Sequence, residues 1–298
     1  FSYDEAIDSL YSVPPAWPTP TKDVSEIRLA IKYKPKKGAK RLLSNTTTLY
    51  LDIIDYPGEW LLDLPLLSLD YEQWSQTQFD SLKGPRKALA AEWLSNIESF
   101  DPLSEANEKQ LEDISKCYTK YLYECKNNGL HWVQPGRFVL PGGLEGAPVL
   151  QFFPYQLLDK EEELSKADKH TNYYMLKSRY KEYQQKVVKR FYKDYFSTFD
   201  RQIVLVDCLQ PLNAGYDSFH DMKDALEQIM KSFRYGRSSM LKRLFSPRID
   251  KILFAATKAD HITPEQHPNL ISLLQQMVHP SWQHAAFENI EMECISIA

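Results

Sequence analysis

Residues 252–260 read Ile-Leu-Phe-Ala-Ala-Thr-Lys-Ala-Asp, an apolar run that ends in a polar turn. A short apolar run of this kind predicts a buried strand that is covered on both faces of a sheet. Similar runs stand at 202–206 and 292–297, and amphipathic stretches at 216–233 and 269–278 separate the three runs. Strand, helix, strand, helix, strand is the order of a parallel α/β sheet. We therefore expect an α/β fold over residues 200–298.

The N-terminal region predicts two more strands. Residues 27–33 alternate apolar and polar side chains, and residues 46–54 are rich in β-branched residues. The basic stretch 34–41 lies between them, so we expect an antiparallel hairpin with a long loop. The second strand ends in the turn Asp55-Tyr56-Pro57-Gly58, and its apolar composition predicts that it is buried.

Residues 70–199 have a helical pattern, interrupted between His131 and Pro154. We expect helices at 86–97, from a cap at Ser104 to a stop at Asn127-Asn128-Gly129, and at 173–196. The predicted organisation is one α/β core in two parts, 1–69 and 200–298, with a helical insertion at 70–199.

Composition excludes several classes of protein. The 298 residues hold 36 Lys and Arg against 40 Asp and Glu, and this net charge of −4 disfavours a general nucleic-acid binder. A hydrophobic content of 43% excludes a mostly disordered chain. No apolar run approaches the ~20 residues that span a bilayer. The four cysteines lack paired zinc spacing, and with no signal peptide this predicts a reduced, cytoplasmic chain.

Two strand ends carry the chemistry. Asp55 and Gly58 form a DxxG element, in which the carboxylate holds a water of a Mg²⁺ shell and the glycine N–H approaches a terminal phosphate. Thr257-Lys258-Ala259-Asp260 is a TKxD variant of the guanine-reading NKxD element. Asp260 can accept the guanine N1–H and the 2-amino group together, and Lys258 can lay its stem along the base. The alternatives are an ordinary turn after the strand and a surface Lys and Asp that cap the next helix.

The order of the two elements is more specific than either alone, because both follow strands at the carboxyl edge where α/β sheets bind ligands. Thr257 replaces the usual Asn. No two of the ten glycines lie five residues apart, so a GxxxxGK[ST] phosphate loop is absent from these residues. In folds that combine these two elements, the phosphate loop precedes the hairpin. The chain also starts without Met and stops in an apolar run. We therefore expect the phosphate loop upstream of Phe1.

Residues 55–66, Asp-Tyr-Pro-Gly-Glu-Trp-Leu-Leu-Asp-Leu-Pro-Leu, resemble the signature of the YcjX family of bacterial Ras-like GTP-binding proteins linked to stress responses. The resemblance extends over the whole chain, including the helical insertion and the TKxD element. It implies a Ras-like P-loop GTPase core with a mostly parallel sheet, one antiparallel hairpin and a large helical insertion. It also implies Mg²⁺, GTP or GDP, and a P-loop that this sequence lacks.

Further roles follow from the resemblance. Thr21 or Thr19 stands where Ras-like proteins coordinate Mg²⁺, although a simple Pro/Thr loop accounts for both residues equally well. Glu59 takes the place of the Gln that orients the attacking water, and its charge predicts slow hydrolysis. Ser296 to Ala298 are candidates for the loop that contacts the base from the far side.

The sequence therefore predicts a slow GTPase switch in a bacterial stress response, cytoplasmic or peripheral at the inner membrane. The alternative is a nucleotide-binding scaffold without useful hydrolysis, whose insertion binds a protein or membrane partner. An ATPase is disfavoured, because adenine offers Asp260 neither an N1–H nor a 2-amino group. The partner surface would be the basic face of residues 173–196, unless that face is only solvated; it comprises Lys177, Arg179, Lys181, Lys186, Lys189, Arg190 and Lys193.

Overall fold

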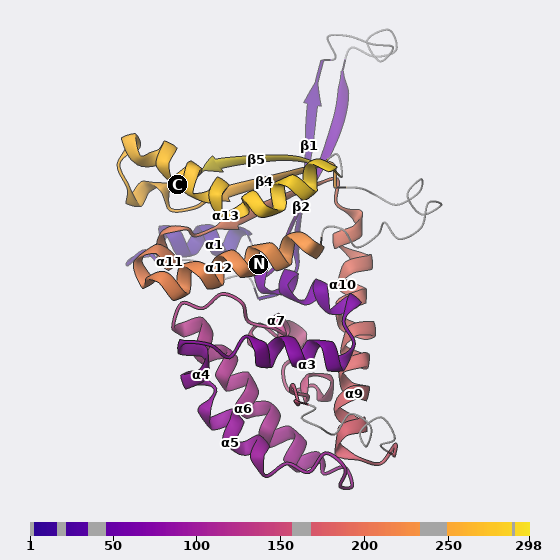
Figure 1. Cartoon of the computed structure of the whole chain (residues 1–298). Coiled ribbons are helices and arrows are strands. Elements are labelled where there is room, and N and C mark those ends of the chain that lie inside the picture. Colours follow the sequence, from indigo (N-terminus) through magenta and orange to yellow (C-terminus); the bar gives the residue numbers. More distant parts are fainter. Residues whose placement is uncertain (1–2, 17–21, 35–45, 157–167, 233–248, 288–289) are drawn as a thin grey trace.

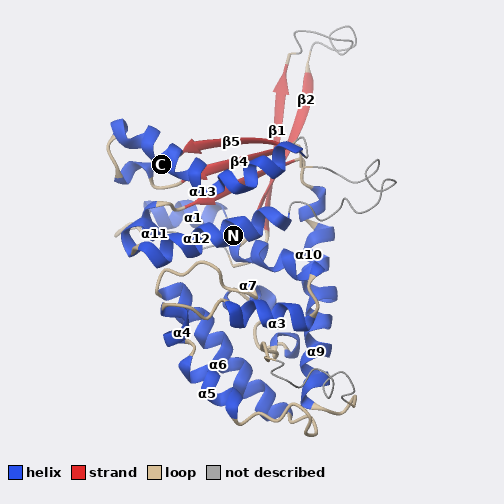
Figure 2. Cartoon of the chain, viewed as in Figure 1, coloured by secondary structure: helices blue, strands red, loops and turns tan. Residues whose placement is uncertain are grey.

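A three-stranded parallel sheet forms the C-terminal part of the computed structural model, which describes residues 3–16, 22–34, 46–156, 168–232, 249–287 and 290–298. Its strands lie in the order β3 (Arg201–Val206), β4 (Lys251–Ala256) and β5 (Glu291–Ser296) (Figures 1 and 2). Val204 pairs with Phe254, and Phe254 with Cys294. The predicted parallel strands are therefore confirmed to within one residue at most ends.

Helices α12 (Tyr216–Ser232) and α13 (His267–Phe287) pack against this sheet through buried apolar residues such as Leu226, Met230, Leu270 and Leu274. The short helix α11 (Leu209–Ala214) leads from β3 into α12, and the short 3-10 turns η7 (Ala259–His261) and η8 (Pro264–Gln266) lead from β4 into α13. The prediction that 202–206 is covered on both faces is wrong. Ile203 and Leu205 are 60% and 63% exposed, because successive side chains of a strand point to opposite faces and these two point away from the core that Val204 and Val206 join.

The predicted antiparallel hairpin is confirmed as β1 (Ser25–Tyr33) and β2 (Thr47–Asp55), with Leu29 opposite Leu51. It projects beyond the rest of the molecule in Figure 1. The expectation that the second strand is buried is wrong, since seven of its nine residues are exposed. A two-stranded ribbon buries its apolar side chains only when another layer covers a face, and among the described residues most of this ribbon has no such layer.

The described part of residues 70–199 (70–156 and 168–199), called here the helical region, packs around a core of aromatic side chains that includes Trp74, Trp93, Tyr118, Tyr180 and Tyr183. Its elements are α3 (Tyr71–Asp80), α4 (Pro85–Leu89), α5 (Ala91–Glu98), α6 (Glu108–Asn127), α7 (Gly136–Val139), η2 (Gly142–Leu144), η3 (Pro148–Leu150), α9 (Asn172–Tyr183), η4 (Gln184–Val188), α10 (Lys189–Asp194) and η5 (Phe196–Thr198). A separate helix, α1 (Tyr3–Tyr11), stands at the N-terminus.

The N-terminal end of α6 differs from the prediction, and its C-terminal end agrees with it. Asn107, rather than Ser104, caps α6 by accepting the N–H of Gln110. Ser104 instead accepts a hydrogen bond from the Asn172 side chain. The predicted stop is confirmed, because Gly129 has a φ of 75°, which favours glycine over other residues.

The segment that joins the hairpin to the helical region is the 3-10 helix η1 (Gly58–Ser68). Every residue from Trp60 to Leu66 is buried, and the apolar ones belong to the same core as the aromatic residues above. The long predicted helix at 173–196 is interrupted by a π-helical turn, η4, whose Gln184 donates to the carbonyl oxygens of Leu66 and Leu69. The turn after Asp55 thus continues directly into the helical core.

The structure has none of the long apolar helices that membrane spans require, as far as its described residues go.

Candidate functional site

The TKxD loop is held by its backbone to both neighbouring strands. Thr257 N–H donates to Val206 O (3.0 Å), and Ala259 N–H donates to Ile297 O (3.0 Å). Between them Lys258 has a φ of 59°, in the left-handed region that few residues other than glycine adopt. The loop therefore has a defined shape at the carboxyl edge of the sheet, where α/β folds bind ligands.

The side chains of this loop point in different directions. Lys258 Nζ lies 2.6 Å from Asp207 Oδ2, at the end of β3. Partial burial pushes the pKa of Asp207 up, but the Lys258 contact and the N–H groups of Gln210 and Leu209 outweigh it and lower that pKa. Asp260 is 62% exposed, with His261 as a distant neighbour at 3.9 Å. Lys258 is thus anchored, and the Asp260 carboxylate is open to a ligand.

The predicted base-contacting segment lies beside the TKxD loop. Ile297 N–H donates to Ala256 O (2.8 Å), and its carbonyl oxygen accepts from Ala259. The structure therefore brings Thr257, Lys258, Asp260 and the Ser296–Ala298 segment to one edge of the sheet. Their roles toward a nucleotide stay predictions.

The DxxG turn lines a cavity of about 370 Å³ that also reaches the open edge of β3. Asp55, Gly58 and Glu59 contribute from one side, and Asp207 from the end of β3. Asp207 also contacts Lys258, so one residue of the cavity lining touches the TKxD element, although that element does not itself line the cavity. A Cβ built on Gly58 would meet nothing within 4 Å. Packing among the described residues therefore gives no reason for glycine at this position, whereas close approach of a ligand would give one.

Glu59 lines the same cavity, but its carboxylate is ion-paired. Lys126 Nζ, at the end of α6, lies 2.6 Å from Glu59 Oε1. The backbone of Glu59 is also in close contact with the helical region, since a Cβ on Gly136 would lie 1.9 Å from Glu59 O. The residue predicted to orient water is thus held by α6 and α7.

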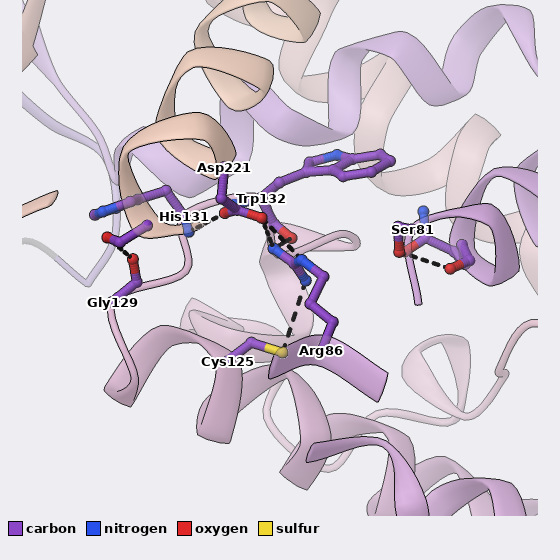
Figure 3. A network of polar contacts seen from close by, with 9 residues as sticks. Ser81, Arg86, Cys125, Gly129, His131, Trp132 and Asp221 are labelled. Carbon is purple, nitrogen blue, oxygen red and sulfur yellow. Dashed lines mark hydrogen bonds and ion pairs between the residues drawn. The ribbon is translucent and has the colours of Figure 1, made fainter. Parts of the chain in front are cut away.

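A buried network joins the helical region to α12 (Figure 3). Asp221 Oδ1 accepts from Arg86 Nη2 (2.5 Å) and Nε (2.8 Å), and both side chains are about nine-tenths buried. Asp221 Oδ2 accepts the backbone N–H groups of His131 and Trp132 (2.5 and 2.8 Å), and the carbonyl oxygen of Trp132 accepts from Arg86. Ser218, also in α12, donates to Gly129 O. The loop after α6 is therefore fixed on α12.

This loop places His131 in the lining of the cavity, together with Asp55, Gly58, Glu59 and Asp207. Sequence reasoning passed over both His131 and Asp207. Asp207 could have been found, because it is a polar residue directly after an apolar strand, like Asp55. His131 had no such signal, since a single histidine in a loop has no spacing that indicates a site.

The structure describes only one of the residues that are predicted to bind Mg²⁺. Thr21 and Thr19 lie outside the described residues, while Asp55 is at the cavity. Nowhere in the described ranges do three or more His, Cys, Asp or Glu side chains form a group that could hold a metal. A single carboxylate fits Mg²⁺, which binds through one or two carboxylates with phosphate oxygens and water.

Four of the seven basic residues on this face of the long helix pair with nearby acids, and one of the four is not at the surface. Arg179 is buried and donates to Glu108 and to Gln151 O, so its predicted place on the exposed face is wrong. The other ion pairs on this face are Lys177–Glu72, Lys186–Glu182 and Arg190–Asp194.

Comparison with known proteins identifies the family. The model of the YcjX-like family, DUF463, matches residues 1–298. The chain is 56% identical to Ras-like GTPase YcjX of Escherichia coli K12 over 300 aligned residues, which cover all of this chain and 64% of that protein. It is 44% identical to Ras-like GTPase YcjX of Shewanella oneidensis, covering all of this chain and 62% of that protein. The chain thus spans less than two thirds of these relatives. The family match over its whole length, and the resemblance in residues 55–66, show that the chain belongs to the YcjX-like family.

Proposed function

We propose that this chain forms the guanine-reading and switching part of a slow GTPase. In this proposal Asp260 reads the base, with Thr257, Lys258 and Ala298 around it, and Asp55 and Thr21 hold Mg²⁺. Gly58 contacts the terminal phosphate of GTP. The division into a Ras-like core at 1–69 and 200–298 and a helical insertion at 70–199 belongs to the same proposal.

The observation that most supports this function is the cavity at the DxxG turn. Asp55 and Gly58 line it, and so does Asp207, which contacts Lys258 of the TKxD element. The names of the relatives, Ras-like GTPases, agree with this chemistry.

The switching part of the proposal rests on η1. Gly58 begins η1, whose next residues, Trp60 to Leu66, are buried among the helices. A contact between a terminal phosphate and Gly58 would therefore act on the packing of the helical region, as ordering by a γ-phosphate does in nucleotide switches. The ion pair of Glu59 with Lys126 supports slow hydrolysis, because a carboxylate that is held by Lys126 is less available to orient the attacking water. A part in a bacterial stress response rests on the family resemblance alone.

The test compares GTP and ATP on the full-length protein. We expect Mg²⁺-dependent hydrolysis of GTP, no comparable hydrolysis of ATP, and a change in Trp60 fluorescence between GDP and a non-hydrolysable GTP analogue. A Trp60→Phe variant identifies the Trp60 signal. Equal use of ATP would overturn guanine reading. GTP binding without turnover would favour the alternative, a scaffold whose helical region binds a protein or membrane partner.

A further inference from the structure

Asp207 joins the end of strand β3 to the lysine of the TKxD loop. We propose that Asp207 is a positioning residue, which holds the Lys258 ammonium in place before a nucleotide binds and so orders the lysine stem for contact with the guanine base. This inference rests on the proposed function and deepens it, because it names the residue that pre-organises the base site. Asp207 itself would touch neither the base nor the reacting phosphate.

The first argument is the place of the two residues in the sheet. Strands β3 and β4 are parallel, with Val206 opposite Ala256, so the residues that follow the two strands leave the sheet side by side at the same edge. Thr257 N–H donates to Val206 O (3.0 Å) and extends the pairing by one step. The register of the sheet therefore brings Asp207 and Lys258 together.

The second argument is that both carboxylate oxygens of Asp207 have partners. Oδ1 accepts the backbone N–H groups of Leu209 and Gln210, each at 3.1 Å, at the start of α11. Oδ2 lies 2.6 Å from Lys258 Nζ. One oxygen thus anchors the carboxylate to the main chain, and the other holds the ammonium in a charge-assisted contact.

The third argument is that the lysine is held at both ends. Its backbone has a φ of 59°, and the N–H groups of Thr257 and Ala259, on either side of it, are bonded to the main chain of neighbouring segments. His267, at the start of α13, adds a ring contact to Ala259 O (3.0 Å). A four-carbon stem between a fixed backbone and a fixed carboxylate keeps few rotamers, yet the side chain is still 52% exposed. The stem is therefore ordered and open to a flat ligand.

The fourth argument concerns a competing partner for the ammonium. Asp260 stands two residues after Lys258 and carries the carboxylate that is predicted to read the base. An unanchored lysine could pair with that carboxylate and block it. Among the described residues, however, Asp260 has only the His261 ring, at 3.9 Å, as an ionic neighbour. Asp207 therefore also keeps the base-reading carboxylate free of the lysine in its own loop.

The experiment measures GDP binding to the full-length protein by calorimetry, without Mg²⁺. Asp207→Asn keeps an oxygen for the two backbone N–H groups but removes the charge that holds Lys258. We expect this variant to bind GDP about 3- to 10-fold more weakly, as for the lost order of one long side chain, and to show the loss for GTP in KM and not in kcat. The matched control is Asp250→Asn, which removes an exposed carboxylate beside the start of β4, at the opposite end of the sheet, and should leave GDP affinity unchanged.

A double-variant cycle separates positioning from a general effect on folding. If Asp207 acts through Lys258, adding Asp207→Asn to Lys258→Met should weaken GDP binding by less than about twofold further, because no ammonium is left to hold. The full loss in both backgrounds would overturn the inference. A loss that appears only for GTP with Mg²⁺ would overturn it too, because Asp207 would then serve the metal or the terminal phosphate from its place in the cavity lining.

The proposed function and this inference fail by different results. A wild-type protein that folds normally and binds no guanine nucleotide would overturn both. A wild-type protein that binds GDP, together with an Asp207→Asn variant that binds it equally well, would overturn the role of Asp207 alone.

Discussion

Asp63 offers a pH-dependent test of how η1 is held in the helical region. Its carboxylate is 2% exposed and accepts three hydrogen bonds, from Gly136 N–H (2.7 Å), Arg137 N–H (3.2 Å) and Tyr183 OH (2.6 Å). Burial raises the pKa of Asp63 from 3.8 to about 6, even though these three donors act to lower it. The folded protein therefore binds a proton at Asp63 that the unfolded chain has already released.

The size and sign of the effect follow from this difference. The gap between 3.8 and about 6 spans about two pH units, each worth about 1.4 kcal/mol, so Asp63 contributes ~3 kcal/mol. Because the pKa is higher in the folded state, this stability is fully present below about pH 4 and is lost as pH rises through about 6. Asp63→Asn removes the titrating carboxylate and with it this dependence of stability on pH.

The assay is urea unfolding of wild type and Asp63→Asn at pH values from 4 to 8, with the exposed Asp80→Asn as control. The free energy of unfolding of Asp63→Asn minus that of wild type should rise by ~3 kcal/mol between pH 4 and pH 7. The same difference for Asp80→Asn should stay nearly constant. A flat or falling difference for Asp63→Asn would refute the reasoning, because it would mean that the three donors keep the carboxylate charged throughout.

Three further predictions concern the site. Asp260→Asn should weaken GTP binding by about 10- to 150-fold and strengthen XTP binding, since the Asn amide can donate to the xanthine carbonyl; a competition assay that still prefers GTP would contradict base reading. Glu59→Gln and Lys126→Ala should leave the hydrolysis rate similar or raise it, and a fall by orders of magnitude in single-turnover kinetics would make Glu59 the base. Arg86→Met should lower the free energy of unfolding, measured in urea, by about 3–5 kcal/mol, because it leaves Asp221 buried without its cationic partner. Adding Asp221→Leu should recover part of this loss. Strictly additive losses in the double variant would count against a coupled pair.

The sheet could be predicted from the sequence because local patterns determine it. Apolar runs between amphipathic stretches predicted β3, β4 and β5, and Gly129 predicted the end of α6. The prediction of burial on β2 and β3 failed for one reason. An apolar strand indicates that something should cover it, but not whether the covering element lies among the same residues.

The candidate site was predictable where a residue stands at a strand end. Asp55, Lys258 and Asp260 were found in this way, and their nucleotide roles remain to be tested. The partners of these residues were not predictable: Lys258 with Asp207, and Glu59 with Lys126, 67 positions away. Such pairs depend on which elements pack together, and neither period nor spacing encodes that.

By itself the sequence determined the order of strands and helices, the two motif-bearing turns and the family. These depend on side-chain periodicity and on short runs of residues, which can be recognised without knowledge of the packing. Only the tertiary structure decided that η1 lies inside the helical core and that His131 reaches the cavity at the DxxG turn. The physical reason is that a buried charge needs partners wherever the fold can supply them. Asp221 obtains its partners from Arg86 and from the backbone at His131, which lie 135 and 90 positions away along the chain.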